Sequence, residues 1–186
     1  MMKCKALVLG LLSIVGIHAA SIDTSKVNVI WTAYKTPAKV AVSGTFKDIA
    51  FKFGKKQDSI AATLEGASAT IDPMKVNLND DVKNANLRDF FFSKFSKKEI
   101  KVTLHDVVEG KDQGTILASV RMNGKTNKVP MEYKIENGVL KARGVLDLSE
   151  FKLSEARANL QKAVSDLHEG MTWSQVTIGF EAPIKK

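Results

Sequence analysis

Apolar and polar residues alternate one by one along much of the chain. The pattern is clearest in seven stretches: 27–33, 60–64, 100–104, 116–122, 129–135, 140–146 and 176–180. In 129–135, for example, Val129, Met131 and Tyr133 share one face, and polar or charged residues occupy most of the other. Alternation with period two predicts antiparallel strands that have one dry and one solvated face.

Two Asn-Gly pairs predict how three of these strands connect. Asn123-Gly124 separates the strands at 116–122 and 129–135, and Asn137-Gly138 separates the latter from 140–146. Asn-Gly tolerates the positive φ angles of a tight hairpin turn. We therefore expect a three-stranded antiparallel meander over about 115–148.

Two stretches have helical spacing instead. From Ser154 to Glu169, apolar side chains recur every three or four residues, and Gly170 follows as a helix-ending residue. This predicts one amphipathic helix of about four turns. Residues 79–95 begin with the possible caps Asn79, Asp80 and Asp81, and predict one or two short helical turns. An open sheet around these helices would leave the backbone of its edge strands unpaired, so the pattern favours a closed barrel.

The first twenty residues have the order of a secretory signal peptide. Lys3 and Lys5 precede an apolar run at 6–17, and Ala19 and Ala20 close the segment. The run is too short for a stable membrane span. We therefore expect residues 1–20 to be cleaved, 21–186 to form a single exported domain, and no transmembrane segment to remain.

Cysteine content and charge narrow the possible functions. The only cysteine, Cys4, lies in the leader, so the mature chain has no thiol chemistry or disulfide. The net charge of +8 falls to +6 without Lys3 and Lys5. The lysine pairs at 55–56 and 97–98 lack the interleaved aromatic residues of a base-stacking surface, so we do not expect nucleic-acid binding.

Motifs with catalytic potential are incomplete. Gly124-Lys125-Thr126 ends like a phosphate-binding loop, but it lies in a hairpin. Residues 66–70 resemble a nucleophile elbow without its last glycine, and their small residues fit a strand that another part of the chain approaches. His105 and His168 have no metal-ligand spacing. We expect no catalytic residue, metal or cofactor; an exported hydrolase that uses His105 or Ser68 is the rival hypothesis.

Three consecutive phenylalanines, at 90–92, suggest a cavity. They cannot all face one core from a helix, because successive residues diverge by about 100°. Either they divide between the core and an exposed cap, or some of them close an apolar cavity over a ligand. In the second case the predicted ligand-binding residues are the inward-facing strand residues and one helical end: Trp31, Phe46, Val102, Val120, Met122, Met131, Tyr133, Ile178 and Phe180, with Leu87, Phe91 and Phe95.

Several short motifs resemble the YceI family of exported bacterial lipid-binding proteins. The family's Arg-Asp-x-His-Leu pattern and double phenylalanine correspond to 83–92, and its glycine- and threonine-rich hairpin to 120–126. A Gly-x-Phe element stands at 44–46, and 144–151 matches the strand that leads into the late helix. In this chain Lys83, Asn84 and Asn86 replace the pattern's Arg, Asp and His, and 23–27 departs from the family's opening motif.

The resemblance implies a mainly β fold: an eight-stranded antiparallel lipocalin-like barrel, covered by helices, with a long apolar tunnel. It also implies a polyisoprenoid or similar long-chain ligand, a homodimer in some members and no enzymatic activity. Together with the leader, the resemblance implies that the domain works in a bacterial periplasm. The replaced polar residues leave the ligand's head group open. A ligand-free barrel that acts as an interaction module remains a third hypothesis.

Overall fold

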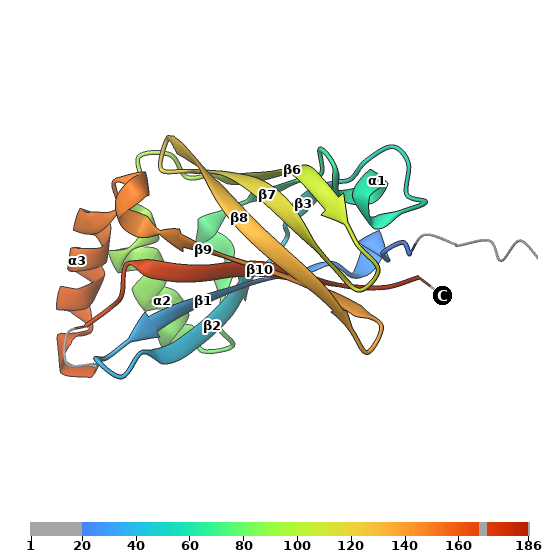
Figure 1. The fold of residues 1–186 in the computed structure, drawn as a ribbon. Coiled ribbons are helices and arrows are strands. Elements are labelled where there is room, and N and C mark those ends of the chain that lie inside the picture. Colours follow the sequence, from blue (N-terminus) through green and yellow to red (C-terminus); the bar gives the residue numbers. More distant parts are fainter. Residues whose placement is uncertain (1–19, 168–170, 186) are drawn as a thin grey trace, which may run out of the picture.

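Ten antiparallel strands form one continuous sheet in the computed structural model, which describes residues 20–167 and 171–185 (Figure 1). The strands, in the order in which they lie side by side, are β3 (Ala50–Lys52), β4 (Ser68–Ile71), β6 (Ile100–Glu109), β7 (Gln113–Met122), β8 (Lys125–Glu136), β9 (Val139–Asp147), β10 (Gln175–Pro183), β1 (Asn28–Lys35), β2 (Val40–Phe46) and β5 (Val76–Asn77). The sheet curls into a half-barrel, with the helices α2 (Asp81–Phe90) and α3 (Ser154–Ala163) at one end and α1 (Ile60–Leu64) at the other.

The predicted meander is confirmed as β7, β8 and β9. Asn123 and Gly124 have φ angles of 50° and 77°, and Asn137 and Gly138 have φ angles of 53° and 75°. Two consecutive positive φ angles are those of the tight hairpin turn that Asn-Gly favours. Each turn therefore fixes the register of its hairpin, pairing residue 122 with 125 and residue 136 with 139.

The expected eight-stranded closed barrel was wrong in strand number and in closure. The described chain has ten strands, and the edge strands β3 and β5 do not pair with each other. Three short or weakly alternating strands, β2, β3 and β5, gave no clear signal in the sequence. β3 and β5 contain three and two residues, which is too short for a period to be recognised.

Residues 60–64 are a helix, α1 (Ile60–Leu64), and the strand predicted there was wrong. The side chain of Ser59 caps the helix by accepting from the backbone N–H of Ala62 at 3.0 Å. Ile60 and Leu64 are both buried and lie four residues apart. Over five residues this spacing fits a helix face as well as alternate positions of a strand.

The two longer helices lie near the predicted positions. α2 (Asp81–Phe90) is longer than the one or two turns expected and is capped by Asp80, whose carboxylate accepts from the N–H of Lys83 at 3.0 Å. α3 (Ser154–Ala163) is shorter than expected. The described residues also form five short 3₁₀ turns: η1 (Thr24–Lys26), η2 (Pro73–Lys75), η3 (Phe92–Lys94), η4 (Leu148–Phe151) and η5 (Ser165–Leu167), the last of which follows α3.

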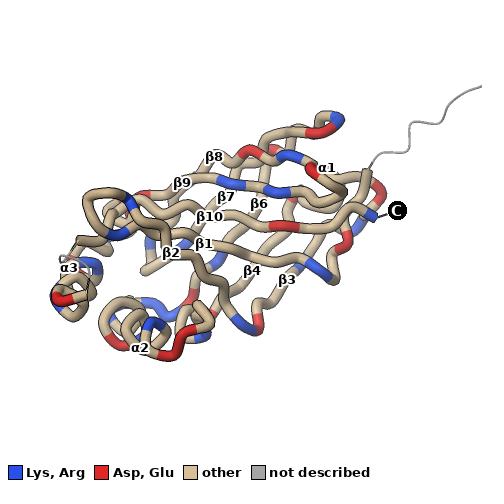
Figure 2. The backbone as a smooth tube through the Cα atoms, turned by 90° about the horizontal axis from the view of Figure 1, so that it is seen from below, with Lys and Arg blue, Asp and Glu red and all other residues tan. Residues whose placement is uncertain are grey.

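The predicted leader and its cleavage site lie almost wholly outside the described residues, as do His168 and Gly170. Near the start of the described residues, Ile22 is fully buried and forms a β-bridge with Ile184, close to the other terminus. No helix in 20–167 or 171–185 is long and apolar enough to span a bilayer. Figure 2 shows basic and acidic residues interspersed along the described chain.

Asn123 joins three segments at the helical end of the sheet. Its Oδ1 accepts from the backbone N–H of Ser96 at 2.7 Å and from the Ser96 hydroxyl at 2.9 Å. Its Nδ2 donates to the carbonyl of Phe151 at 3.0 Å. The β7–β8 hairpin is thereby tied to the segment after η3 and to η4. Asn137, at the same position of the next hairpin, is exposed and makes no such side-chain bonds in the described structure.

We predict that Asn123→Ala lowers the free energy of unfolding by about 1–3 kcal/mol more than Asn137→Ala does, as measured by urea unfolding. Both substitutions place alanine at a positive φ, which costs about 1–2 kcal/mol. Only the first also leaves the Ser96 N–H and the Phe151 carbonyl without their partner. Equal effects of the two variants would contradict the role given to the Asn123 side chain.

Candidate functional site

A cavity of about 200 Å³ runs through the interior of the half-barrel. A water-sized group occupies on the order of 10–15 Å³ on this measure, so the cavity has room for about a dozen such groups. Its lining comes from most of the strands and from both longer helices: Val27, Val29, Ile30, Trp31, Ala33, Phe46, Phe51, Phe53, Ala69, Ile71, Leu87, Phe91, Phe92, Ile100, Val102, Leu104, Val120, Met122, Met131, Leu146, Leu148, Arg157, Leu160, Thr172, Trp173, Val176, Ile178, Gly179 and Phe180.

The cavity is long and almost entirely apolar. From Val27, the residue before β1, to Ala33 on β1, its lining extends about 20 Å at the strand rise of about 3.3 Å per residue. Arg157 is its only charged lining residue in the described chain. The lining fits a long hydrocarbon chain that lies along the strands better than a compact polar substrate.

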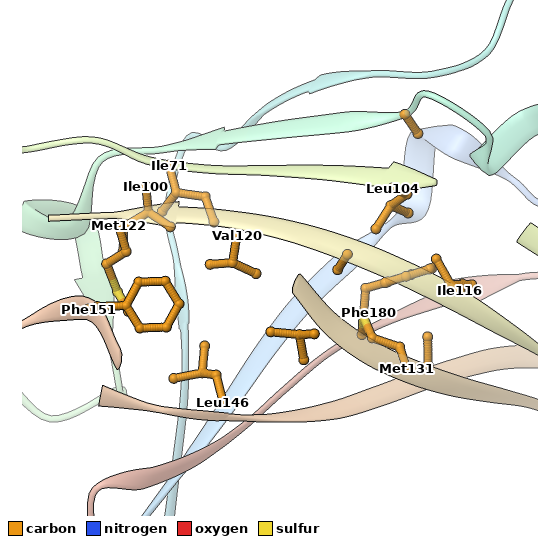
Figure 3. Packing of buried hydrophobic residues seen from close by; sticks show 14 of the residues in the cluster. Ile71, Ile100, Leu104, Ile116, Val120, Met122, Met131, Leu146, Phe151 and Phe180 are labelled. Atoms are coloured by element: carbon orange, nitrogen blue, oxygen red, sulfur yellow. The ribbon is translucent and has the colours of Figure 1, made fainter. Parts of the chain in front are cut away.

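Short side chains and large aromatic rings share the wall of the interior, and together they leave its centre unfilled. Val29, Val102 and Val176 point into the half-barrel, yet each keeps part of its surface accessible. Figure 3 shows side chains such as Val120, Leu146 and Phe180 reaching inward from several strands. Protein interiors are normally close-packed, so a cavity of this size is a specific feature of the fold.

Ten of the twelve residues predicted to bind ligand line this cavity: Trp31, Phe46, Leu87, Phe91, Val102, Val120, Met122, Met131, Ile178 and Phe180. The structure therefore brings them together around one space. That a ligand contacts them stays a prediction. The other two, Phe95 and Tyr133, are buried but do not reach the cavity.

The phenylalanines after α2 divide between the two proposed roles. Phe91 and Phe92 line the cavity, whereas Phe90 is 38% exposed. Phe95 packs edge-on against Phe91 and Phe92, with ring centroids 5.2 and 5.3 Å away. It supports the lining from behind, because the 3₁₀ turn η3 folds it back onto the two rings.

Tyr133 is directed away from the cavity by its place in the sheet. It pairs with Gly114 of β7, and a Cβ added to Gly114 would lie 2.5 Å from the Tyr133 ring. The glycine thus leaves space for the aromatic ring to lie flat on the neighbouring strand. Burial raises the pKa of the Tyr133 phenol above its usual value.

The polar part of the lining was missed by the sequence reasoning. Arg157 is half-buried on α3, and its Nη1 donates to the carbonyl of Thr172 at 2.7 Å. Thr172 and Trp173 precede β10 in a segment without alternation. The indole of Trp173 donates to the carbonyl of Thr36 at 2.8 Å, and the Lys39 ammonium lies 4.2 Å from the indole centroid. Only the folded chain shows that this segment closes the α3 end of the cavity.

The residues named for a hydrolase do not form a catalytic pair. Ser68 pairs with Thr103 across β4 and β6, and His105 lies two residues further along β6. No hydrogen bond joins Ser68 to His105 in the described structure. A nucleophile and its base need such a contact. The described residues also contain no group of three or more His, Cys, Asp and Glu side chains placed to hold a metal.

Comparison with known proteins now identifies the family. The model of the YceI-like domain matches residues 21–183. The chain belongs to the YceI-like domain family. No curated protein matches this YceI-like chain in sequence.

Solved structures share the fold at low sequence identity. A polyisoprenoid-binding domain from Saccharophagus degradans, implicated in plant cell wall breakdown, is 16% identical with a TM-score of 0.60, over 90% of this chain and 98% of that one. BcnA from Burkholderia cenocepacia is 17% identical with a TM-score of 0.60, over 89% and 99% of the two chains. The YceI protein of Campylobacter jejuni is 18% identical with a TM-score of 0.56, over 78% and 85%.

The three polar positions at which this YceI-like chain departs from the family pattern do not line the cavity. Asn84 is buried, and its Oδ1 accepts from the backbone N–H of Leu78 at 2.9 Å. Lys83 forms an ion pair with Asp80 at 2.8 Å. Asn86 is also absent from the lining. In the described structure Asn84 therefore ties α2 to the segment before it, the Lys83 ion pair lies within the start of α2 itself, and the cavity's polar groups lie elsewhere.

We predict that Gly44→Ala shifts the fluorescence emission of Trp31 and lowers the melting temperature. Gly44 pairs with Trp31, and its added Cβ would lie 2.5 Å from the Trp31 ring, which lines the cavity. Gly114→Ala is the comparison variant, because its Cβ would clash with the Val108 carbonyl oxygen and lie 2.5 Å from the Tyr133 ring without touching a tryptophan. Gly114→Ala should lower the melting temperature and leave the tryptophan emission unchanged. An unchanged emission in Gly44→Ala would contradict the packing described.

Proposed function

We propose that this YceI-like protein binds and carries a long-chain amphiphile, a polyisoprenoid or fatty-acid-like lipid, in its interior cavity. The observation that carries the proposal is a space about 20 Å long, lined by apolar side chains between Val27, which precedes β1, and Ala33 on β1, and by apolar side chains of other strands. The related domain from Saccharophagus degradans is described as polyisoprenoid-binding, which supports the same ligand class.

Hydrocarbon burial alone would supply the affinity. Each buried methylene contributes about 0.8 kcal/mol, so a chain of about a dozen carbons gains about 10 kcal/mol before the costs of association. Such a ligand needs few polar contacts, in keeping with one charged residue in the described lining. Met122 and Met131 lie in the lining, and their flexible thioethers can adapt to a long chain.

We propose the periplasm as the place of action, because the order of residues 1–20 is that of a secretory leader. The exported protein should begin at Ala20 or Ser21, as N-terminal sequencing of the periplasmic form would show. Finding Met1 on a membrane-bound form would contradict export.

Self-association, which the family resemblance implies for some members, stays a prediction.

Mass spectrometry of organic extracts tests the ligand directly. Protein purified from its native host should release a long-chain amphiphile in an amount comparable to that of the protein. Protein denatured before extraction and washed with solvent serves as the blank. If native-host protein releases no long-chain compound and takes up none in vitro, the carrier proposal is wrong.

We predict that Val120→Trp displaces the ligand while the protein stays folded. Val120 lines the cavity from β7, so the larger ring can occupy ligand space. In a filled core the same change would cost about 1–3 kcal/mol by overpacking. Val145→Trp on β9 is the matched control, because Val145 is 58% exposed and does not line the cavity. Melting temperature and extracted lipid should be measured on each preparation; a strongly destabilised Val120→Trp that still carries lipid would contradict the assignment.

A further inference from the structure

The α3 end of the cavity differs from the rest because it combines the one charged residue of the described lining with an unpaired hydroxyl; the indole N–H of Trp31, on β1, is the other unpaired polar group of that lining. Arg157 on α3 and Thr172 before β10 both belong to the lining. The Thr172 Oγ1 is buried without a hydrogen-bond partner. Buried hydroxyls are nearly always paired, and an unpaired one in a cavity wall calls for a functional explanation.

Most of the N–H donors of the Arg157 guanidinium have no acceptor in the described structure. A guanidinium carries five N–H donors. The described structure shows one used, by the Thr172 carbonyl at 2.7 Å. That bond also places the guanidinium beside the residue whose hydroxyl is unpaired. The two groups together form a fork of donors at one end of an otherwise apolar space.

The nearby carboxylate of Asp147 does not occupy this fork. Its Oδ1 accepts from the Ser149 hydroxyl at 2.7 Å, and its Oδ2 accepts from the Ser174 hydroxyl at 2.8 Å. Hydrogen bonds from Ser149 lower the pKa of Asp147 most, with smaller contributions from Ser174 and the charge of Arg157. Asp147 therefore stays negative at neutral pH and partly offsets the positive charge of Arg157, which favours a singly charged partner over a doubly charged one.

We propose that the α3 end of the cavity is a head-group site, in which Arg157 and the Thr172 hydroxyl bind the carboxylate of a fatty-acid-like ligand. The inference rests on the proposed function, since it assigns the polar end of the same ligand. A planar carboxylate matches the guanidinium fork with two parallel hydrogen bonds. The hydrocarbon tail then extends from Leu160 and Trp173 past Trp31 toward Val27, along β1.

Contacts with neighbouring segments hold the residues of this site in position. Thr172 bridges to Lys35 of β1, and Trp173 is fixed by its hydrogen bond to the Thr36 carbonyl. Arg157 is held from the other side by α3, whose buried Ala156 packs into the core. Two elements thus position the donors independently of any ligand, which lowers the ordering cost of binding.

The test compares three ligands that share one C18 chain: oleate, oleyl alcohol and oleyl phosphate, titrated into delipidated mature protein at neutral pH. We expect oleate to bind at least about tenfold more tightly than the alcohol and more tightly than the phosphate. Arg157→Met should reduce oleate affinity to that of the alcohol and leave alcohol binding unchanged. Arg157→Lys should recover part of the preference, because it keeps the charge and loses the fork. Thr172→Val, which keeps the shape, should cost oleate a few-fold in affinity.

Arg121→Met on β7 is the matched control, because Arg121 is exposed and lies outside the lining. It should leave all three affinities unchanged. If oleate and oleyl alcohol bind the wild-type protein equally, or if Arg157→Met keeps the preference for oleate, the head-group site is wrong and the carrier proposal stands. If none of the three ligands binds, and farnesol does not bind either, both proposals are wrong. Should Arg157→Met fail to fold, Arg157→Lys and Thr172→Val decide the question.

Discussion

The whole structure depends on a curved sheet whose apolar concave face does not close on itself and leaves a cavity in the interior. Valines at 29, 102, 120 and 176 share that face with aromatic residues such as Trp31, Phe51 and Phe180. Burying these side chains from water favours the curled sheet, although together they do not fill its centre. The hydrophobic burial that folds the domain and the apolar cavity in its interior thus have the same origin.

Because the edge strands β3 and β5 do not pair, helical segments must complete the enclosure. The aromatic cluster of Phe46, Phe91, Phe92 and Phe95 links the end of β2 to η3, with successive centroid distances of 5.1 to 6.0 Å. Asn84 and Asn123 tie the same segments to the chain by side-chain hydrogen bonds. The cover is therefore a built part of the domain, held by packing and by polar ties that lie outside the cavity.

The sequence was informative where structure is local and periodic. The Asn-Gly turns identified the meander, and alternation identified which residues of β7, β8 and β10 face inward. It misled at 60–64, where five residues fit two periodicities, and at Tyr133, whose ring is drawn over Gly114 of the next strand. It gave no signal for Thr172 or Trp173, since their place in the lining depends on which distant segments pack against them. The polar end of the cavity could be found only in the folded chain.

The chain's two tryptophans, Trp31 and Trp173, both stand in the wall of the cavity, one on β1 and the other at its α3 end. Trp31 has a buried indole N–H with no partner, whereas the N–H of Trp173 is already bonded to a backbone carbonyl. A molecule that entered the cavity should therefore change the surroundings of the two indoles in different ways. The protein thus carries two optical probes for the proposed ligand, one on β1 and one at the α3 end. In a variant with one tryptophan replaced by phenylalanine, the fluorescence of the remaining tryptophan would report whether a ligand has reached its part of the cavity.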